Sequence, residues 1–329
     1  MYRIGIIGLG VIYRQYIQAL AYLKDLPKLV AVCDKNETAL SDGLRMACKI
    51  LGRDDIQGDA NVLSFLDRKE MDVVVIATPP NTHFGLVMEC LKADKKILVE
   101  KPALSSVDNF IEISTLRSDH SLLFQTAFHA AYAADLLWFI HHRQNIERQY
   151  ALGQLMEITC NFSDPYVIHG QLLYGREVLG GSYLDSGVNE LSVISRLTDI
   201  NNLHVLEHNV CRLPDSEIVC QSQTVLKEFH SKIVVKLNTN WMLGKNEKTT
   251  LLIYDTGKAI LLNHTAQTVT KIEGDRKTVL YVKREHPRLL IQYANLLKDY
   301  TRYLDNQVSN YNESLQIHHL LFEPISSPK

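Results

Sequence analysis

The N-terminal third of the chain alternates short apolar runs with longer amphipathic segments. The run YRIGII at residues 2–7 ends at Gly8 and Gly10, a pattern that indicates a buried strand and its exit turn. Apolar residues then recur at helical spacing over residues 11–23, and Pro27 lies beyond the end of that segment. The pattern predicts a strand followed by a helix.

The same alternation continues to about residue 125. Further strands are predicted at residues 28–34, 72–80, 95–102 and 121–129, and helices at residues 36–51, at residues 81–93 and from Ser105. Continuous apolar runs separated by helices are typical of a parallel sheet that is covered on both faces. We therefore predict an α/β domain with a doubly wound, Rossmann-type parallel sheet over residues 1–126.

From about Gly153 the pattern changes to β-rich runs. They lie at residues 153–162, 217–226, 232–241, 249–255 and 258–264, with turn signals at 255–258 and 273–277. These runs predict an α+β domain over residues 127–329, built on an open, mostly antiparallel sheet with one face on a helix layer. An apolar stripe between residues 289 and 304 is interpreted as core packing. A free apolar sheet face is usually covered by another copy, so we expect a homo-oligomer, a dimer or tetramer, through this sheet.

Length, charge and cysteines narrow the functional class. A chain of 329 residues suits two domains. The 35 Lys plus Arg against 37 Asp plus Glu give no general attraction for nucleic acid or an anionic membrane, so small molecules are favoured as partners. The six cysteines form no CxxC pair and no metal-type spacing, which favours reduced thiols in the cytoplasm and no metal. Neither a signal-peptide pattern nor an apolar stretch of about 18 residues is found.

Gly8, Leu9 and Gly10 stand where the front of a dinucleotide fingerprint stands, after a predicted strand and before a predicted helix. The first glycine makes the tight turn, and the second lets the backbone approach a pyrophosphate at the helix N-terminus. The third glycine position holds Tyr13, but that position serves helix packing and not phosphate contact. The alternative is an ordinary strand-to-helix turn on a scaffold that binds no ligand.

Asp34 favours the dinucleotide interpretation. It lies at the end of the second predicted strand, where a carboxylate can accept hydrogen bonds from the ribose hydroxyls of an adenosine. A 2′-phosphate would be repelled there, so we expect NAD, with NADP possible because Lys35 is adjacent.

Two further motifs carry a family resemblance. VIATPPNTH ends at His83 and ILVEKP ends at Glu100-Lys101-Pro102. With Gly8-Leu9-Gly10 and Asp34, they resemble the Gfo/Idh/MocA family of nicotinamide-dependent oxidoreductases over the whole N-terminal domain. The resemblance implies nicotinamide and substrate between two domains. It also implies a catalytic lysine at Lys101 and an often cis peptide bond before Pro102.

Lys101 also stands out from its position alone. It follows the end of a predicted parallel strand, where open α/β sheets bind ligands, and it could exchange a proton with a substrate hydroxyl. The alternative is a solvated lysine at a strand end. The full set of residues expected to bind the cofactor is Gly8, Leu9, Gly10, Val11, Ile12, Asp34, Lys35, Ala77, Thr78, Pro79, Asn81, His83, Glu100, Lys101, Pro102 and His129.

The stretch GGSYLDSGVNELSVI at residues 180–194 supplies the substrate side. In the family, a helix of the second domain carries an Asp followed four positions on by a polar residue, often His. Asp185 and Asn189 occupy these positions and would share a helix face. An amide cannot act as a base, so Asn189 can only exchange hydrogen bonds. The alternative for both residues is helix capping.

A narrower resemblance is to the bacterial aldose 1-dehydrogenases of this family. It rests on the Asp-x-Gly-x-Asn form, on IHGQ at residues 168–171 and on AFHAAY at residues 127–132. The resemblance implies oxidation of an aldose at C1 to a lactone. Lys101 and Asp185 would share the proton, Asn189 and His169 would orient the sugar, and His129 would border the nicotinamide or the substrate.

Other interpretations remain open. His129 and His169 could be packed, hydrogen-bonded residues, and the pairs His141-His142 and His318-His319 are interpreted as surface. The protein could be a non-catalytic regulator that binds NAD. It could also be an oxidoreductase of the same fold that acts on an imine, an inositol, a dihydrodiol or a nucleotide-linked sugar.

Overall fold

The computed structural model describes residues 1–23, 27–116, 124–229 and 231–326. The chain divides into two compact units near the predicted division at residues 126 and 127. Met1–His129 and Leu289–Leu315 form the first unit, and Ala130–Arg288 with the segment from Gln316 forms the second. The segment Leu289–Leu315 therefore folds with the N-terminal unit, although it follows the second sheet in sequence.

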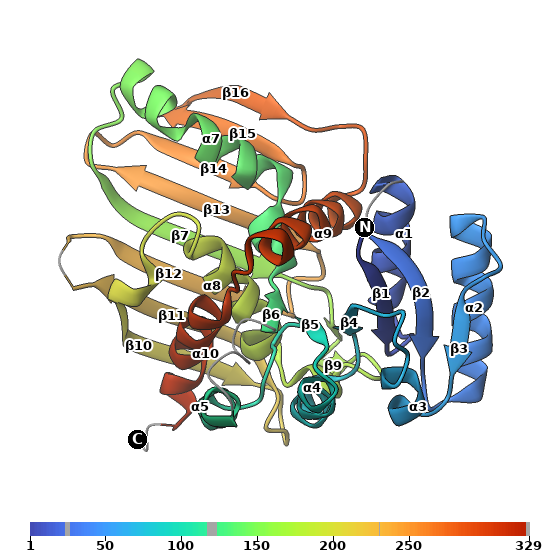
Figure 1. Cartoon of the computed structure of the whole chain (residues 1–329). Helices are drawn as coiled ribbons and strands as arrows, with labels where there is room; N and C mark the ends of the chain where they lie inside the picture. Colours follow the sequence, from blue (N-terminus) through green and yellow to red (C-terminus); the bar gives the residue numbers. More distant parts are fainter. Residues whose placement is uncertain (24–26, 117–123, 230, 327–329) are drawn as a thin grey trace. The chain divides into compact units, whose positions relative to one another are not determined.

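The first unit is built on a parallel sheet of six strands (Figure 1). The strands are β1 (Arg3–Ile7), β2 (Lys28–Cys33), β3 (Gln57–Asp59), β4 (Val73–Ile76), β5 (Lys96–Glu100) and β6 (Phe124–Ala127). Their order is β3-β2-β1-β4-β5-β6, the order of a dinucleotide-binding Rossmann fold. The prediction of a doubly wound parallel sheet is confirmed. Residues 121–123 of the last predicted strand lie outside the described residues.

Helices connect these strands. They are α1 (Tyr13–Leu23), α2 (Glu37–Leu51), α3 (Val62–Leu66), α4 (His83–Lys92) and α5 (Val107–Leu116), with a short 3-10 turn at Pro80–Thr82, and all but α3 lie at predicted helical segments. The helix α9 (Arg288–Asn306) begins after the second sheet in sequence and contains the predicted apolar stripe, and a 3-10 turn at His129–Tyr132 follows β6. Local sequence sets their ends. The Asn36 side chain accepts a hydrogen bond from the Ala39 amide at the start of α2, and Gly52 ends that helix in the left-handed conformation.

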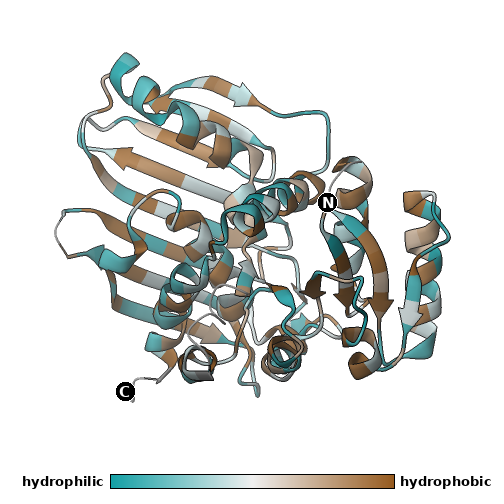
Figure 2. Cartoon of the chain, in the orientation of Figure 1, coloured by the Kyte–Doolittle hydropathy of each residue, from teal (hydrophilic) through white to brown (hydrophobic). Residues whose placement is uncertain are grey.

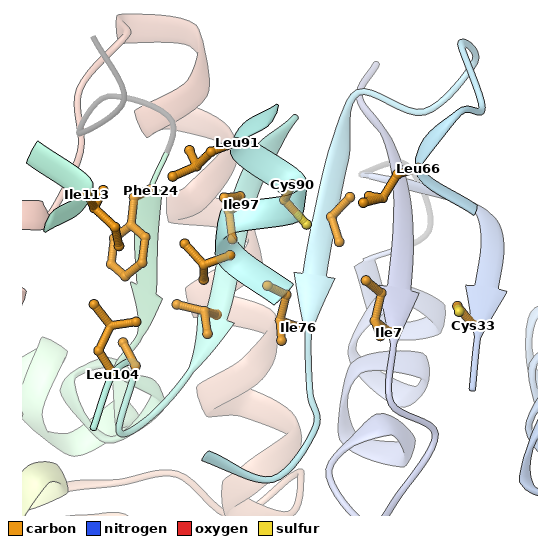
Figure 3. Close-up of a cluster of buried hydrophobic side chains, with 14 of the residues drawn as sticks. Ile7, Cys33, Leu66, Ile76, Cys90, Leu91, Ile97, Leu104, Ile113 and Phe124 are labelled. Carbon is orange, nitrogen blue, oxygen red and sulfur yellow. The ribbon is translucent and has the colours of Figure 1, made fainter. Parts of the chain in front are cut away.

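A continuous apolar cluster packs against the six-stranded sheet (Figure 3). Ile7, Ile76 and Ile97 contribute from neighbouring strands, and Leu91 of α4 and Ile113 of α5 cover them. All five side chains are buried, so this part of the sheet face is excluded from solvent. The cluster fixes the strands, and hence the loops that follow their carboxyl ends.

The second unit is built on a sheet of eight strands. They are β7 (Leu155–Ser163), β10 (Leu203–Arg212), β11 (Val219–Glu228), β12 (Val234–Asn240), β13 (Glu247–Tyr254), β14 (Ala259–Asn263), β15 (Thr268–Glu273) and β16 (Arg276–Val282). Their order is β10-β11-β12-β7-β13-β14-β15-β16, and only the β12-β7 pair is parallel. The prediction of an open, mostly antiparallel sheet is confirmed.

Shorter elements complete the second unit. They are the hairpin β8 (Val167–Ile168) and β9 (Gln171–Leu172), the helices α7 (Ala134–Gln149) and α8 (Val188–Ile194), the 3-10 turns Glu177–Leu179 and Ile200–Asn202, and a π-helical turn at Tyr183–Gly187. The helix α10 (Tyr311–Ser326) begins in the first unit and belongs to the second from Gln316. His318 of α10 is fully buried, so its interpretation as a surface residue is wrong. None of the described helices is both long and apolar enough to cross a membrane.

The strands of this sheet alternate between hydrophobic and hydrophilic residues along their length, which is visible as bands of colour in Figure 2. One face is buried. The opposite face carries a row of polar side chains that crosses the strands in register, formed by Asn209, Gln223, Asn238, Asn161, Thr249 and Asn263. Most of these residues line a groove of about 860 Å³. The expectation of an apolar free face is therefore wrong for this row.

Candidate active site

The predicted cofactor residues follow the carboxyl ends of parallel strands. Gly8 follows β1, Asp34 follows β2, Ala77 follows β4 and Lys101 follows β5. In a parallel sheet these ends share one edge, and β1 and β4 flank the point where the strand order reverses. Open α/β sheets bind ligands at this point. The first unit therefore brings its predicted residues to one edge.

The two glycines of the first loop have different surroundings. A Cβ on Gly8 would lie 2.7 Å from Thr78 Cγ2 and 2.8 Å from the Ala77 carbonyl, and its φ of +91° is one that side chains disfavour. A Cβ on Gly10 would meet no atom within 4 Å. Gly8 is thus required by the fold, whereas Gly10 leaves open space at the helix start. That space fits the approach of a pyrophosphate.

Tyr13, at the third position of the fingerprint, replaces a glycine with a packed ring. Its side chain is fully buried, and its hydroxyl donates to the Gly43 carbonyl of α2 at 3.0 Å. Gly43 also gives space to Leu9, because a Cβ there would lie 2.7 Å from Leu9 Cδ1. The departure from the fingerprint therefore fastens α1 to α2 and leaves the phosphate side of the loop unchanged. Val11 is 76% exposed at the same edge.

Asp34 joins the first loop to the end of β2. One carboxylate oxygen accepts from the Leu9 amide at 2.9 Å, and the other accepts from the Asn36 amide at 2.9 Å. Each oxygen keeps acceptor capacity, since a carboxylate has about four lone-pair sites. The half-buried carboxylate is therefore held in place by backbone and can still accept from a ribose. Lys35 beside it is exposed.

The loop after β4 is tied to the Glu100-Lys101-Pro102 motif through His83. This imidazole is fully buried, with Nδ1 3.0 Å from the Pro102 carbonyl and Nε2 2.8 Å from the Thr78 carbonyl. Burial lowers the pKa of His83, while the carbonyl contacts act in the opposite direction. His83 therefore connects the loop after β4 to Pro102. Pro79 and Asn81, in the same loop, are exposed. The Lys101-Pro102 peptide bond is cis.

The buried carboxyl of Glu100 accepts several hydrogen bonds. Its side chain is 5% exposed, and its Oε1 accepts from the Tyr16 hydroxyl at 2.8 Å and from the Tyr293 hydroxyl at 2.9 Å. Its Oε2 accepts from the Lys101 amide at 3.3 Å. Burial raises the pKa of Glu100, and these hydrogen bonds oppose the rise. The backbone of Lys101 is therefore fixed to a carboxyl that two helices hold, while its side chain remains half-exposed.

His129 continues this arrangement. Its ring stacks on Tyr293 with centroids 5.2 Å apart, and its Nδ1 lies 3.1 Å from Gln292 Oε1. Tyr293 therefore contacts both Glu100 and His129 from α9. The sequence interpretation of α9 as core packing missed this contribution, because a tyrosine in an apolar stripe gives no sign of what its hydroxyl reaches.

In the second unit, Asp185 lies in the π-helical turn that leads into α8. The Asp185 side chain is half-buried, and its backbone carbonyl accepts from Asn189 Nδ2 at 3.1 Å. The Asn189 side chain is 8% exposed. No side-chain capping bond is formed at the start of the turn or of α8, so the capping alternative finds no support. π-helical turns are frequent at functional sites.

A buried charge network anchors this turn. Asp164 Oδ2 accepts from the Ser186 hydroxyl at 3.1 Å and forms an ion pair with Lys248, and Asp164 Oδ1 accepts from Asn246 Nδ2 at 2.9 Å. Burial lowers the pKa of Lys248, and the carboxylates of Asp164 and Asp185 counter that effect. Sequence reasoning missed this network because its members lie about eighty residues apart, as the Asp164 and Lys248 pair shows.

His169 lies at the exposed tip of the β8-β9 hairpin. His169 and Gly170 have φ of +49° and +77°, which suits the two central residues of a tight hairpin turn. Turn geometry alone therefore accounts for the histidine and glycine at these positions. A role of His169 in orienting a sugar stays a prediction.

Comparison with known proteins supports the interpretation of the first unit as a dinucleotide-binding domain. A family model described as oxidoreductase family, NAD-binding Rossmann fold, matches residues 2–128. A dTDP-3,4-didehydro-2,6-dideoxy-alpha-D-glucose 3-reductase from Saccharopolyspora spinosa is 27% identical over 195 residues, which are 56% of this chain and 53% of that protein. A myo-inositol 2-dehydrogenase from Thermotoga maritima is 35% identical over 113 residues, which are 33% of this chain and 32% of that protein.

The chain thus matches about half the length, or less, of these curated relatives. A solved structure covers nearly all of it. A 3-ketoreductase from Actinomadura kijaniata, in complex with NADP and TDP-benzene, superposes with a TM-score of 0.78 over 98% of this chain and 96% of that one. At 17% identity this likeness shows the fold of both units. Residues 2–128 thus match the NAD-binding domain of the Gfo/Idh/MocA oxidoreductases.

Proposed function

We propose that the protein is an NAD(P)-dependent oxidoreductase that acts on a sugar or polyol. The observation that carries the proposal is the position of Lys101 at the end of β5, fixed through its amide to the buried Glu100. Such a half-exposed amine on a rigid support can exchange a proton with a bound hydroxyl. The relatives that reduce a dTDP-linked keto sugar or oxidise an inositol support the substrate class.

The proposed reaction removes a hydride and a proton from one substrate carbon and its hydroxyl. The nicotinamide, when bound, accepts or supplies the hydride. We propose that Lys101 and Asp185 hold and move the hydroxyl proton as a pair, because Asn189 replaces the histidine that often has this role in the family. Asn189 can orient a hydroxyl through its amide, and its Oδ1 is buried without a hydrogen-bond partner among the described residues.

For the finer assignment we propose C1 oxidation of an aldose to its lactone, with NAD preferred over NADP. The carboxylate of Asp34, held by two backbone amides, supports the preference because it would repel a 2′-phosphate. The second candidate is redox chemistry at a ring carbon other than C1, which the named activities of the 3-reductase and inositol 2-dehydrogenase relatives favour.

The test is production of NADH from NAD with a panel of aldoses, inositols and nucleotide-linked sugars. We expect turnover with at least one of them and its loss in Lys101→Met. The matched control is Lys96→Met, at the opposite end of β5, where the ammonium lies 5.1 Å from the Tyr2 ring centroid. Identification of the product as a lactone or a ketone separates the two candidates. Tight NAD binding with no turnover on the whole panel would favour a regulator.

A further inference from the structure

Two cysteines of the second unit lie side by side where strands β10 and β11 pair. In the register of this pair, Cys211 lies opposite Gln221. The next residue, Arg212, lies opposite Val219, so β11 has one extra residue here, Cys220. Such a β-bulge sets two residues of one strand against one residue of the other. Cys220 is therefore a neighbour of Cys211 across the strands, nine residues on in the chain.

The side chains of these two cysteines are in contact and differ in exposure. The Cys220 thiol donates to the Cys211 carbonyl oxygen, with Sγ and O 3.2 Å apart, and it also interacts with the Cys211 thiol. Both cysteines are free; Cys211 is exposed, whereas Cys220 is 1% exposed. Burial raises the pKa of Cys220, and the Cys211 thiol raises it further. A reagent from solvent therefore reaches Cys211 first, and Cys220 supplies the second sulfur.

The Cys220 side chain also packs in a small apolar cluster, which we call the hairpin cluster. Its buried members are Val167, Leu213, Cys220 and Trp241, and Leu172 and Leu179 pack against them. Val167 and Leu172 come from the two strands of the β8-β9 hairpin, and Leu179 directly precedes Gly180. The Cys220 sulfur thus helps to hold the hairpin and the segment that leads to Asp185.

The backbone of β11 contacts that segment directly. A Cβ on Gly181 would lie 2.8 Å from the Val219 carbonyl oxygen, so the Gly181 backbone packs closely on the residue before Cys220. The Gly181 carbonyl in turn accepts from the Asp185 amide at 3.1 Å. A displacement of β11 at the bulge therefore reaches the turn that carries Asp185 through two close contacts.

We propose that Cys211 and Cys220 form a reversible disulfide when the protein meets a hydroperoxide, and that this bond alters the substrate side of the candidate active site. The bond itself is independent of the proposed oxidoreductase function. Only its expected effect on turnover rests on that function.

The reaction with hydrogen peroxide takes two steps. In the first, the Cys211 sulfur loses its proton and attacks one peroxide oxygen; the O–O bond breaks, and hydroxide leaves and takes up a proton to give water. Cys211 is then a sulfenic acid. In the second step, the Cys220 sulfur attacks the Cys211 sulfur; the S–O bond breaks, and hydroxide leaves with the Cys220 proton as water. Two thiols lose two electrons in all, and one peroxide is reduced to two waters.

The effect on the site follows from the position of the Cys220 sulfur. A covalent S–S bond brings two sulfurs closer than any non-bonded contact, with a restricted torsion about the bond. The Cys220 sulfur is therefore drawn toward Cys211 and away from the hairpin cluster, where Trp241 and Val167 lose a packing partner. We expect the β8-β9 hairpin and the Gly181 turn to loosen as a result.

The test treats the folded protein with hydrogen peroxide and counts its free thiols. We expect the count to fall by two from the six of the reduced chain, with a peptide link between Cys211 and Cys220 that dithiothreitol reverses. Cys211→Ser should lose no thiol under the same conditions. Cys220→Ala lacks the second sulfur, so its Cys211 should pass on to the sulfinic acid. The matched control is Cys48→Ser, at a half-buried cysteine of α2 in the first unit, which should leave the link unchanged.

Three results of this experiment would overturn the disulfide. One is an oxidised Cys211 in the wild-type protein without a link to Cys220, and another is a link that uses a different cysteine. The third is an unchanged thiol count in excess peroxide.

Hydrogen exchange tests the conformational effect without any assay of turnover. Amides of residues 166–181 should exchange faster in the oxidised protein than in the reduced one, and peroxide should cause no such change in Cys211→Ser. Equal exchange in a protein that carries the link would reject the effect on the site.

Turnover gives a separate readout once a sugar substrate is known. Peroxide should lower kcat/KM for that sugar by about 10- to 100-fold, the cost that a small misplacement near the chemistry can carry, and should leave NAD affinity unchanged. Cys211→Ser should be insensitive to peroxide. If no sugar is turned over, the proposed reaction fails, while the thiol count and hydrogen exchange still decide this inference.

Discussion

The hydroxyl of Tyr293 provides a direct test of how the Glu100-Lys101-Pro102 motif is held. Tyr293→Phe removes one of the two hydroxyl donors to Glu100 Oε1 and leaves the ring in place. The edge-to-face contact with Tyr16, at 4.9 Å between centroids, and the stack on His129 should both persist. The change is therefore close to a pure loss of one buried hydrogen bond.

The expected magnitude follows from the burial of Glu100. A hydrogen bond to a neutral acceptor contributes about 1 kcal/mol and one to a charged acceptor about 1.5 to 3 kcal/mol. Burial raises the pKa of Glu100, so its carboxyl is protonated at acid pH and ionises as the pH rises. We expect Tyr293→Phe to lower the free energy of unfolding by about 1 kcal/mol at low pH and by about 2 kcal/mol once the carboxyl is ionised. The latter corresponds to about 4 to 8 °C in melting temperature for a domain of 150 to 250 residues.

The same helix supplies a matched control. The Tyr300 hydroxyl is buried without a hydrogen-bond partner among the described residues. Tyr300→Phe should therefore leave the melting temperature unchanged or raise it, because it removes a buried hydroxyl whose desolvation no hydrogen bond to the described residues offsets. Thermal unfolding of both variants across a pH series measures the difference. Tyr16→Phe combined with Tyr293→Phe should cost more than the sum of the single changes, because both donate to one oxygen.

Equal melting temperatures for Tyr293→Phe and Tyr300→Phe would refute this reasoning. So would a Tyr293→Phe effect that shrinks as the pH rises, since the hydrogen bond should strengthen when Glu100 ionises. Either result would mean that Glu100 is satisfied by other groups and that α9 does not position the motif.

Three further predictions address the loop, the cofactor and α8. Gly8→Ala should lower the melting temperature through strain and crowding, whereas Gly10→Ala should leave it unchanged and weaken NAD binding in a titration. Asp34→Ala should reduce the ratio of NAD to NADP affinity, and an unchanged ratio would remove Asp34 from cofactor selection. Burial places the folded-state pKa of Glu190 well above its unfolded value, so its contribution to stability is greatest at acid pH and falls as the pH rises toward that pKa. Glu190→Gln should therefore gain in melting temperature relative to wild type as the pH rises, and a constant difference would contradict the assignment.

Most of the first unit could be predicted from the sequence because its strands are continuous apolar runs between amphipathic helices. The two elements that were missed there, β3 and α3, are short, with three and five residues. β3 is the strand QGD at the sheet edge, which carries no apolar signal. In the second unit β10 also escaped, because its half-exposed pattern over LHVLEHNVCR resembles neither a buried run nor a clean alternation.

In the candidate site too, the residues with a local sequence signal could be predicted and the others could not. Gly8, Asp34 and Lys101 could be predicted because each follows a recognisable strand. The groups that hold them could not, because hydrogen-bond partners such as Tyr293 and Glu100 are 193 residues apart and nothing local links them. The burial of His318 escaped for a related reason, since the adjacent His319 suggested a polar segment although the two side chains have different exposures.

In each unit, the residue next to the proposed catalytic residue is fixed by hydrogen bonds to a buried carboxyl group. In the first, the residue before Lys101 is a buried carboxyl that accepts from donors on α1 and α9. In the second, the residue after Asp185 is a serine whose hydroxyl donates to the buried carboxylate of Asp164. In both cases a neighbour is fixed and the functional side chain is left half-exposed. A buried carboxyl with several donors is costly unless all its partners are present, so it selects one backbone position over slightly displaced ones. That selectivity matters for proton transfer, which requires heavy atoms within hydrogen-bond reach.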